Sequence, residues 1–276
     1  MFAVGLLQRT WARFDLAGLR RASAAFVLLA VARALAGQEP PPEAPPIRER
    51  LYRLEPGPIG ESELRRRFEP AQLAVLEKLN RAGVSHLPRL ETLVVPGEWL
   101  EDELRYSPFP PSSAWAAGHP KALVVDQPAQ AFGAYAAGRL VRWGPVSSGR
   151  RQHPTPSGLF HLNWRSRGRH STVDPDWYMP WYFNFDNDRG LALHQFTLPG
   201  RPASHACVRL LERDAVWLYE WGEGWTLDAR GWNVLDPGTP LWIAGRYDFD
   251  APPPWRSLEW LARGVELPEP GPEAPP

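Results

Sequence analysis

Short apolar runs separated by turn-forming residues dominate the second half of the chain. Runs of this length, bounded by glycine, proline and serine, predict β-strands rather than helices. The expected strands cover residues 122–126, 131–135, 139–146, 159–162 and 238–243. Ala137-Gly138 predicts a hairpin turn between the second and third strands, and residues 214–221 have helical spacing. The pattern therefore predicts a mainly β domain with a few short helices, at residues 121–246.

A small α+β unit is expected ahead of this domain, at residues 51–97. Its elements in order are a strand at residues 51–54, helices at 61–68 and 70–81, and a strand at 92–96. Pro70 suits the first position of the second helix, because a proline there loses no intrahelical hydrogen bond. Strand, helix, helix and strand within so short a segment predict a separate folded unit.

Proline-rich stretches separate and follow these two units. Residues 37–50 are a Pro-rich linker, and residues 247–276 are expected to form a Pro-rich C-terminal tail. Residues 98–120 form a connector that proline interrupts too often for regular elements. Its aromatic residues are expected to anchor it on the next domain: Trp99, Tyr106, Phe109 and Trp115.

The first 36 residues are typical of an export signal. A basic start precedes an apolar run at residues 22–32, and Ala34-Leu35-Ala36 provides the small residues of a cleavage site. An uncleaved membrane anchor and an organelle transit peptide are the alternatives. An export signal places the chain in the periplasm or cell wall, and the only contact with a membrane would be through that anchor.

The charge balance argues against a nucleic-acid partner. Across 276 residues, 31 Lys and Arg balance 31 Asp and Glu, and the basic N-terminus leaves the remainder mildly acidic. Such a balance offers no electrostatic attraction to phosphate backbones. With 43% hydrophobic residues the chain has ample material for a packed core.

Candidate chemistry gathers around Cys207, the only cysteine of the chain. His194 and His205 lie close to it in the sequence, and a neighbouring base or positive charge turns a thiol into a nucleophile. Ser204 and Arg209 complete the segment. The alternative for a single cysteine is a small buried apolar residue.

Five sequence blocks in fixed order resemble the L,D-transpeptidase catalytic domain family, which makes peptidoglycan cross-links. The blocks are K-A-L-V-V-D, G-R-L-V-R-W-G-P-V-S-S-G-R, H-P-T-P-S-G-L-F-H-L, L-H-Q-F and P-A-S-H-A-C-V-R-L, spread over residues 121–245. The resemblance implies a sandwich-like β fold without a cofactor. It implies peptidoglycan stem peptides and glycan strands as partners.

By this resemblance Cys207 is the nucleophile and His194 the base. The carbonyl of Gln195 would hold the imidazole, and backbone amides from His205 to Cys207 would form the oxyanion hole. His205 is the rival base, although its counterpart in the family belongs to the cysteine motif. Ser204 is expected to shape the loop. Ala206 stands where the family usually has glycine, so the backbone there must accommodate a Cβ atom.

Substrate contacts are assigned to three residues. Arg209 binds a substrate carboxylate or stabilises the thiolate, with a salt bridge as the alternative. Trp181 and Tyr182, from an aromatic stretch, line the donor cleft or pack in the core. A zinc site at His194, His205 and Cys207 is disfavoured because no second cysteine or H-E-x-x-H motif accompanies them.

The α+β unit resembles a lysin-motif (LysM) module, a fold that binds cell-wall glycans. The resemblance rests on Tyr52-Arg53-Leu54-Glu55-Pro56-Gly57, Leu79-Asn80-Arg81 and Leu93-Val94-Val95-Pro96. The family usually has an acidic residue after the turn glycine, where this chain has Pro58. A spacer that binds nothing is the alternative. For the whole chain, hydrolysis of stem peptides by a carboxypeptidase or endopeptidase and non-catalytic wall binding are the alternatives to transpeptidation.

Overall fold

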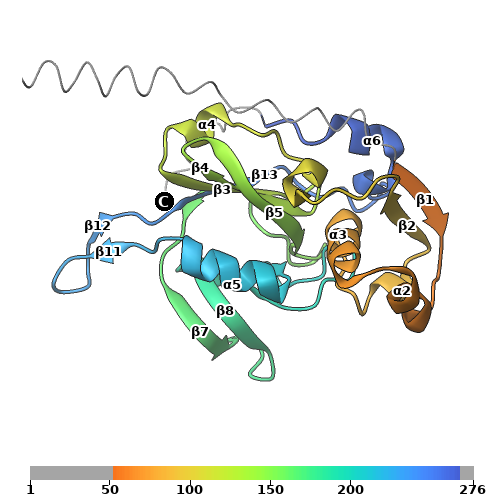
Figure 1. Cartoon of the computed structure of the whole chain (residues 1–276). Helices are drawn as coiled ribbons and strands as arrows, with labels where there is room; N and C mark the ends of the chain where they lie inside the picture. Colours follow the sequence, from red (N-terminus) through yellow and green to blue (C-terminus); the bar gives the residue numbers. More distant parts are fainter. Residues whose placement is uncertain (1–51, 268–276) are drawn as a thin grey trace, which may run out of the picture. The chain divides into compact units, whose positions relative to one another are not determined.

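The computed structural model describes residues 52–267. Most of the chain is arranged around one large, curled sheet (Figure 1). Its strands are β3 (Lys121–Asp126), β4 (Ala131–Ala136), β5 (Arg139–Ser147), β6 (Gly158–His161), β7 (Arg165–His170), β8 (Tyr178–Asp186), β9 (Leu191–Gln195), β10 (Val208–Leu210) and β13 (Pro240–Ala244). They follow the order β6-β13-β3-β4-β5-β10-β9-β8-β7. The mainly β fold class is thereby confirmed.

The central hairpin forms where the sequence predicts it. β4 and β5 pair antiparallel, and Ala137 and Gly138 both have positive φ, 46° and 79°. Positive φ at both turn residues matches the twist of the flanking strands. α5 (Glu212–Trp221) covers the predicted helical segment and packs on β8 and β9.

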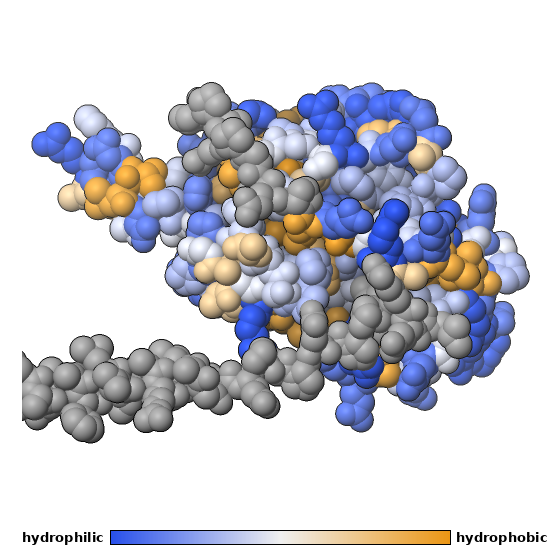
Figure 2. Space-filling view, turned by 90° about the horizontal axis from the view of Figure 1, so that it is seen from above, coloured by the Kyte–Doolittle hydropathy of each residue, from blue (hydrophilic) through white to orange (hydrophobic). Residues whose placement is uncertain are grey.

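The pattern of apolar residues in the sequence did not predict several of the strands. β7 has arginines at every second position and β10 has only three residues, so neither gives an apolar alternation. A second sheet pairs β11 (Thr226–Leu227) with β12 (Val234–Asp236) as a hairpin that projects from the body (Figure 1). Its exposed apolar side chains, coloured orange in Figure 2, include Val234 and Leu235.

The N-terminal unit has the predicted order of elements. They are β1 (Tyr52–Pro56), α2 (Glu61–Arg67), α3 (Pro70–Asn80), the 3-10 helix η2 (Leu87–Arg89) and β2 (Thr92–Pro96), with β1 and β2 antiparallel. β1 runs two residues beyond the strand expected at residues 51–54, because Pro56 still pairs with Thr92. The LysM identity of this unit and its binding of glycan stay predictions.

α3 is fixed at both ends. Glu69 and Gln72 form a capping box around Pro70 at its start, and Arg81 ends it in the left-handed conformation, with φ of 56°. The Arg81 side chain is buried, contacts the rings of Trp143 and Trp255, and donates a hydrogen bond of 2.7 Å to the Ala129 carbonyl. Burial lowers the pKa of Arg81 to about 9. α3 is therefore joined directly to the main sheet.

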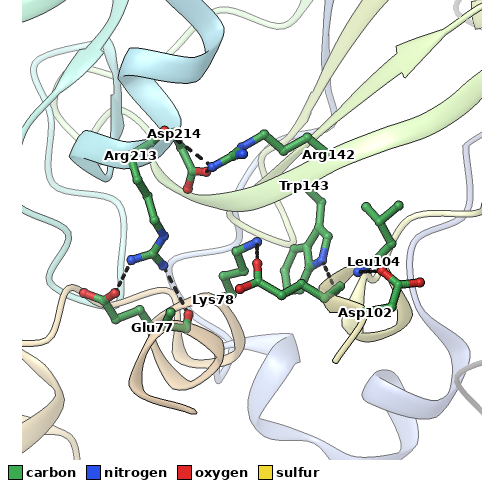
Figure 3. Close-up of polar contacts among 10 residues, drawn as sticks. Glu77, Lys78, Asp102, Leu104, Arg142, Trp143, Arg213 and Asp214 are labelled. Atoms are coloured by element: carbon green, nitrogen blue, oxygen red, sulfur yellow. Dashed lines mark hydrogen bonds and ion pairs between the residues drawn. The ribbon is translucent and has the colours of Figure 1, made fainter. Parts of the chain in front are cut away.

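The N-terminal unit and the β domain share one hydrophobic core. A single cluster of buried side chains contains Tyr52, Val75, Leu79, Val94, Ala122, Val124, Trp143 and Trp242. Ion pairs border this core (Figure 3). Glu77 and Lys78 of α3 pair with Arg213 and Glu103, while Arg142 holds the buried Asp214 at 2.7 Å. Residues 51–97 and 121–246, expected as separate domains, thus pack as one body.

The connector at residues 98–120 and the segment after residue 247 also pack on this core. The connector contains a 3-10 helix, η3 (Glu103–Tyr106), and the short α4 (Ala114–Ala117), and its Tyr106 and Phe109 are buried as expected. Instead of the tail expected from residue 247, η4 (Pro254–Arg256) and α6 (Leu258–Arg263) follow, and Trp255 is fully buried. Burial of aromatic side chains such as Trp255 holds this segment in a fixed conformation although it is rich in proline.

The predicted export signal at residues 1–36, the linker at 37–50 and the end of the chain from residue 268 lie outside the described residues. Within residues 52–267, no helix is long and apolar enough to cross a bilayer.

Candidate active site

The strands that carry the candidate base and nucleophile are neighbours. β9 and β10 pair in parallel, and their register places Arg209 beside His194. Because alternate residues of a strand share a face, Cys207 and Arg209 project on the side of the sheet that holds His194. Parallel pairing requires the connecting segment to return along the sheet. The loop of residues 196–207 makes this return and ends at Cys207.

His194 is held as a neutral imidazole. It is buried, and its Nδ1 lies 3.0 Å from the carbonyl oxygen of Gln195, which can only accept. Nδ1 therefore carries the proton and Nε2 has a free lone pair. Burial lowers the pKa of His194 to about 4, the Gln195 carbonyl opposes this change, and Arg209 adds to it. At neutral pH the ring can accept a proton at Nε2.

Cys207 is a protonated thiol in the resting protein. Burial raises the pKa of Cys207, and the backbone hydrogen bond with Ala192 and the positive charge of Arg209 only partly oppose this. The thiol therefore needs a base at the moment of attack, since it is not poised as a thiolate.

Both side chains open into one cavity of about 410 Å³. Its wall includes six of the residues predicted for the site: Tyr182, His194, Ser204, His205, Cys207 and Arg209. Gln195, Ala206 and Trp181 are not part of the wall. The tertiary structure thus gathers residues from three strands, β8, β9 and β10, and one loop around the thiol.

The loop before Cys207 is held in a strained conformation. Ala206 has φ of 76°, the left-handed region that suits glycine, so its Cβ atom is accommodated at a cost. Thr155 fixes this position by donating a 2.9 Å hydrogen bond to the Ala206 carbonyl, and Ser204 donates to the Cys207 carbonyl. Among the described residues, no group accepts a hydrogen bond from the amides of His205 and Ala206.

His205 is engaged in an aromatic stack. Its ring lies 3.4 Å from that of His153 and 5.5 Å from that of Trp177, centroid to centroid. Arg150 Nη2 lies 3.2 Å from His205 Nδ1. Desolvation lowers the pKa of His205, and His153 and Arg150 add to this. The stacked His153 ring covers one face of the His205 ring and Arg150 contacts one of its nitrogens, which favours His194 as the base.

Arg209 faces the cavity without an acidic partner. Its guanidinium carbon lies 4.5 Å from the centroid of the Phe196 ring. Within residues 52–267 it forms no ion pair, so the alternative of a salt bridge has no partner there. Burial lowers the pKa of Arg209, while the Cys207 side chain opposes this change. A substrate anion would complete its interactions.

The aromatic stretch divides between cavity and core. Tyr182 lines the cavity, and its hydroxyl donates a 3.0 Å hydrogen bond to the Gly190 carbonyl. Trp181, predicted for the same cleft, instead packs against Tyr219 of α5 at 5.4 Å between centroids. The φ of Trp181 is 53°, which interrupts the alternation of β8 and turns its side chain away from the cavity.

Arg169 on β7 is a cavity residue that the sequence reading missed. The alternation of Arg165, Arg167 and Arg169 is compatible with a strand, but it does not single out Arg169, which alone of the three lines the cavity. Trp177 and residues 171–173 of the β7–β8 loop also line the cavity. No group of three His, Cys, Asp or Glu side chains in residues 52–267 is arranged to hold a metal ion.

The β domain is the part of the chain that matches a known protein family. Residues 120–243 match the YkuD family model, described as the L,D-transpeptidase catalytic domain. The matched segment therefore resembles a YkuD domain. The resemblance seen in the five sequence blocks is thereby confirmed, and all candidate residues from Arg169 to Arg209 lie inside the matched segment. The N-terminal unit lies outside it.

Three solved L,D-transpeptidases are among the structures similar to this chain. The protein from Stackebrandtia nassauensis is 24% identical, with a TM-score of 0.38, over 47% of this chain and 57% of that chain. The enzyme from Mycobacterium smegmatis is 19% identical, with a TM-score of 0.37, over 46% and 59%. L,D-transpeptidase 3 from Mycobacterium tuberculosis, with a faropenem-derived adduct, is 20% identical, with a TM-score of 0.36, over 46% and 60%.

The aligned part of this chain thus spans less than two thirds of the length of each of these proteins. No curated protein matches the chain.

Proposed function

We propose that this protein is an exported L,D-transpeptidase that cross-links peptidoglycan stem peptides through a thioester on Cys207. The observation that carries this proposal is the placement of a buried, neutral His194 and the sole thiol on one wall of a cavity within the segment that matches the YkuD family. Export rests on the sequence of residues 1–36.

The first half-reaction forms the thioester. His194 Nε2 takes the proton of the Cys207 thiol as the sulfur attacks the carbonyl carbon of the stem-peptide diamino acid. A tetrahedral oxyanion results. Collapse breaks the carbon–nitrogen bond to the terminal D-alanine, whose nitrogen takes the proton from His194 and leaves as an amine.

The second half-reaction transfers the acyl group. The side-chain amine of another stem attacks the thioester carbonyl, His194 accepts a proton from that amine, and the carbon–sulfur bond breaks. The Cys207 sulfur then regains a proton from His194. A new amide joins the two stems, and the protein returns to its starting state.

The loop before Cys207 supports stabilisation of the oxyanion. The amides of His205 and Ala206 have no acceptor among the described residues, and the left-handed φ of Ala206 sets the direction of the neighbouring peptide groups. Amides fixed in this way stabilise developing negative charge without reorganising. Ser204 and Thr155 hold the loop through its carbonyl groups.

Mass spectrometry tests this function directly. Purified protein is incubated with a disaccharide tetrapeptide, with and without an acceptor stem, and with a carbapenem that would acylate the thiol. We expect a covalent adduct on wild type, a cross-linked product with acceptor, and neither with Cys207→Ala. An unchanged intact mass and unchanged muropeptides with wild type would refute the proposal. A product formed only with water would assign the protein as a hydrolase.

A further inference from the structure

Arg169 lies in the wall of the cavity that holds Cys207 and His194. Its guanidinium carbon lies 5.1 Å from the centroid of the Trp164 ring and 5.0 Å from that of Tyr182. Within residues 52–267 its side chain forms no hydrogen bond and no ion pair. A partly buried guanidinium with two aromatic contacts and no acceptor retains its full capacity to bind an anion.

The two rings that contact Arg169 are themselves fixed. Trp164 Nε1 donates a 2.9 Å hydrogen bond to the Asn187 side chain, and the Tyr182 hydroxyl donates to the Gly190 carbonyl. Both rings belong to the cavity wall. Arg169 is therefore held in place before any ligand arrives, which reduces the entropy lost on binding.

The other arginines of β7 are used differently. Arg165 donates to the carbonyls of Tyr219 and Gly222, and the Arg167 guanidinium lies 5.3 Å from the Trp181 ring, outside the cavity wall. Of the three arginines on this strand, Arg169 alone lines the cavity. Arg167 thus provides a matched control on the same strand.

A second unpaired cation faces the same space. Arg209 stacks on Phe196 and also lacks an acidic partner among the described residues. Of the other charged groups in the wall, Arg189 is paired with Asp186 at 3.2 Å, and Asp188 supplies one negative charge. Two free guanidinium groups against a single carboxylate leave the cavity with a net positive charge, and each guanidinium can bind one anionic group of a ligand.

The two cations differ in their distance from the reaction. Arg209 follows Cys207 by two residues and lies beside His194 in the β9–β10 register, whereas Arg169 is on β7, two strands beyond β9 in the sheet. Arg209 is thus the nearer cation to the thiol. In the acyl donor of the proposed reaction, the carboxylate of the terminal D-alanine lies close to the attacked carbonyl. A carboxylate at the end of the diamino acid side chain lies further away.

We propose that Arg169 binds the side-chain carboxylate of the diamino acid of the donor stem, while Arg209 binds the carboxylate of the leaving D-alanine. This inference rests on the proposed function and deepens it. Arg169 then determines specificity, because a donor whose diamino acid is amidated at that carboxyl group presents a neutral amide, which leaves the guanidinium uncompensated.

Binding without turnover tests this assignment. In the Cys207→Ala background, calorimetry compares a tetrapeptide carrying the free side-chain carboxylate with the same peptide amidated there. Amidation removes the charge-assisted hydrogen bond to Arg169, so it should weaken binding by about 10-fold to 100-fold. Arg169→Gln should abolish this preference, Arg169→Lys should restore part of it, and Arg167→Gln should leave it intact.

The outcomes separate this inference from the proposed function. Equal affinity for the two peptides, or a preference that survives Arg169→Gln in a protein with an unchanged melting temperature, would overturn the role of Arg169. If wild type cross-links both peptides with equal kcat/KM, the function stands and the inference is wrong. If the preference is present and wild type forms no thioester, the carboxylate site stands and the proposed chemistry is wrong.

Discussion

The backbone amide of Gly83 donates a hydrogen bond of 2.9 Å to the carbonyl of Leu198. Gly83 belongs to the N-terminal unit, and Leu198 lies in the loop that joins the strand of His194 to Cys207. Ala82 forms an isolated antiparallel bridge with Pro199 in the same place, and Leu198 is fully buried. The N-terminal unit therefore holds the middle of the nucleophile loop.

We expect Gly83→Pro to slow acylation of Cys207. Proline removes the amide proton that Leu198 accepts, and the extended bridge conformation of Ala82 is compatible with a following proline. A small displacement of a reacting group costs a large factor in rate, so the acylation rate should fall about tenfold or more. Stopped-flow acylation by a carbapenem measures it, at a temperature where the variant is folded.

Gly83→Ala is the matched control for that change. A Cβ atom at this position would meet Leu211 at 3.7 Å and the Leu198 oxygen at 3.9 Å, both ordinary contacts, and the amide is retained. Its acylation rate should stay within about twofold of wild type. Equal rates for the proline and alanine variants would show that the contact does not position the loop.

Ala206→Gly is expected to stabilise the protein. With φ of 76°, alanine is strained by about 1–2 kcal/mol, whereas glycine adopts this conformation freely. The greater entropy of glycine in the unfolded chain offsets about 0.5–1 kcal/mol, which leaves a gain of up to about 1.5 kcal/mol in the free energy of unfolding. Urea denaturation measures the difference.

Ala203→Gly serves as the comparison for this prediction, because Ala203 has no positive φ and lies in the same loop. It should lower the free energy of unfolding by about 0.5–1 kcal/mol. Should both glycine variants lose stability equally, the left-handed conformation of Ala206 would not be strained.

His194 should make stability depend on pH between its two pKa values. The imidazole has a pKa of 6.5 when unfolded and about 4 when folded, so the unfolded chain binds more protons in this interval. The contribution is complete above pH 6.5 and is lost as the pH falls toward 4, by about 3 kcal/mol in total.

The measurement is the difference in unfolding free energy between wild type and His194→Gln from pH 7 to pH 4, which cancels the other titrating groups. The gap in favour of wild type should shrink as the pH falls. A difference that stays constant over this range would mean that His194 titrates normally in the folded protein.

Alkylation of Cys207 should report a protonated thiol at neutral pH. Since burial raises the pKa of Cys207, the rate of reaction with iodoacetamide should rise with pH only above the ordinary range of a cysteine thiol. Intact mass after timed quenching gives the rate, and Cys207 is the sole thiol of the chain. A midpoint near or below pH 7 would instead indicate a thiolate–imidazolium pair in the resting protein.

The amino-acid sequence by itself predicts part of this structure. Apolar runs and turn residues predicted β3, β4, β5, β6 and β13, together with the N-terminal strand–helix–helix–strand order, because these depend on local spacing. The solitary Cys207, flanked by His194, was equally visible as candidate chemistry. Local pattern also carried the family resemblance, since its blocks are short and contiguous.

Only the tertiary structure decided what depends on distant contacts. Trp181 lies outside the cavity because its positive φ turns the side chain away. Arg169 lines the cavity because β7 pairs with β8. Neither relation can be predicted from local spacing in the sequence. The segment after residue 247 is folded because the Trp255 side chain is buried beside Arg81. The predicted separate units became one body for the same reason: burial and pairing are properties of surfaces that meet only after folding.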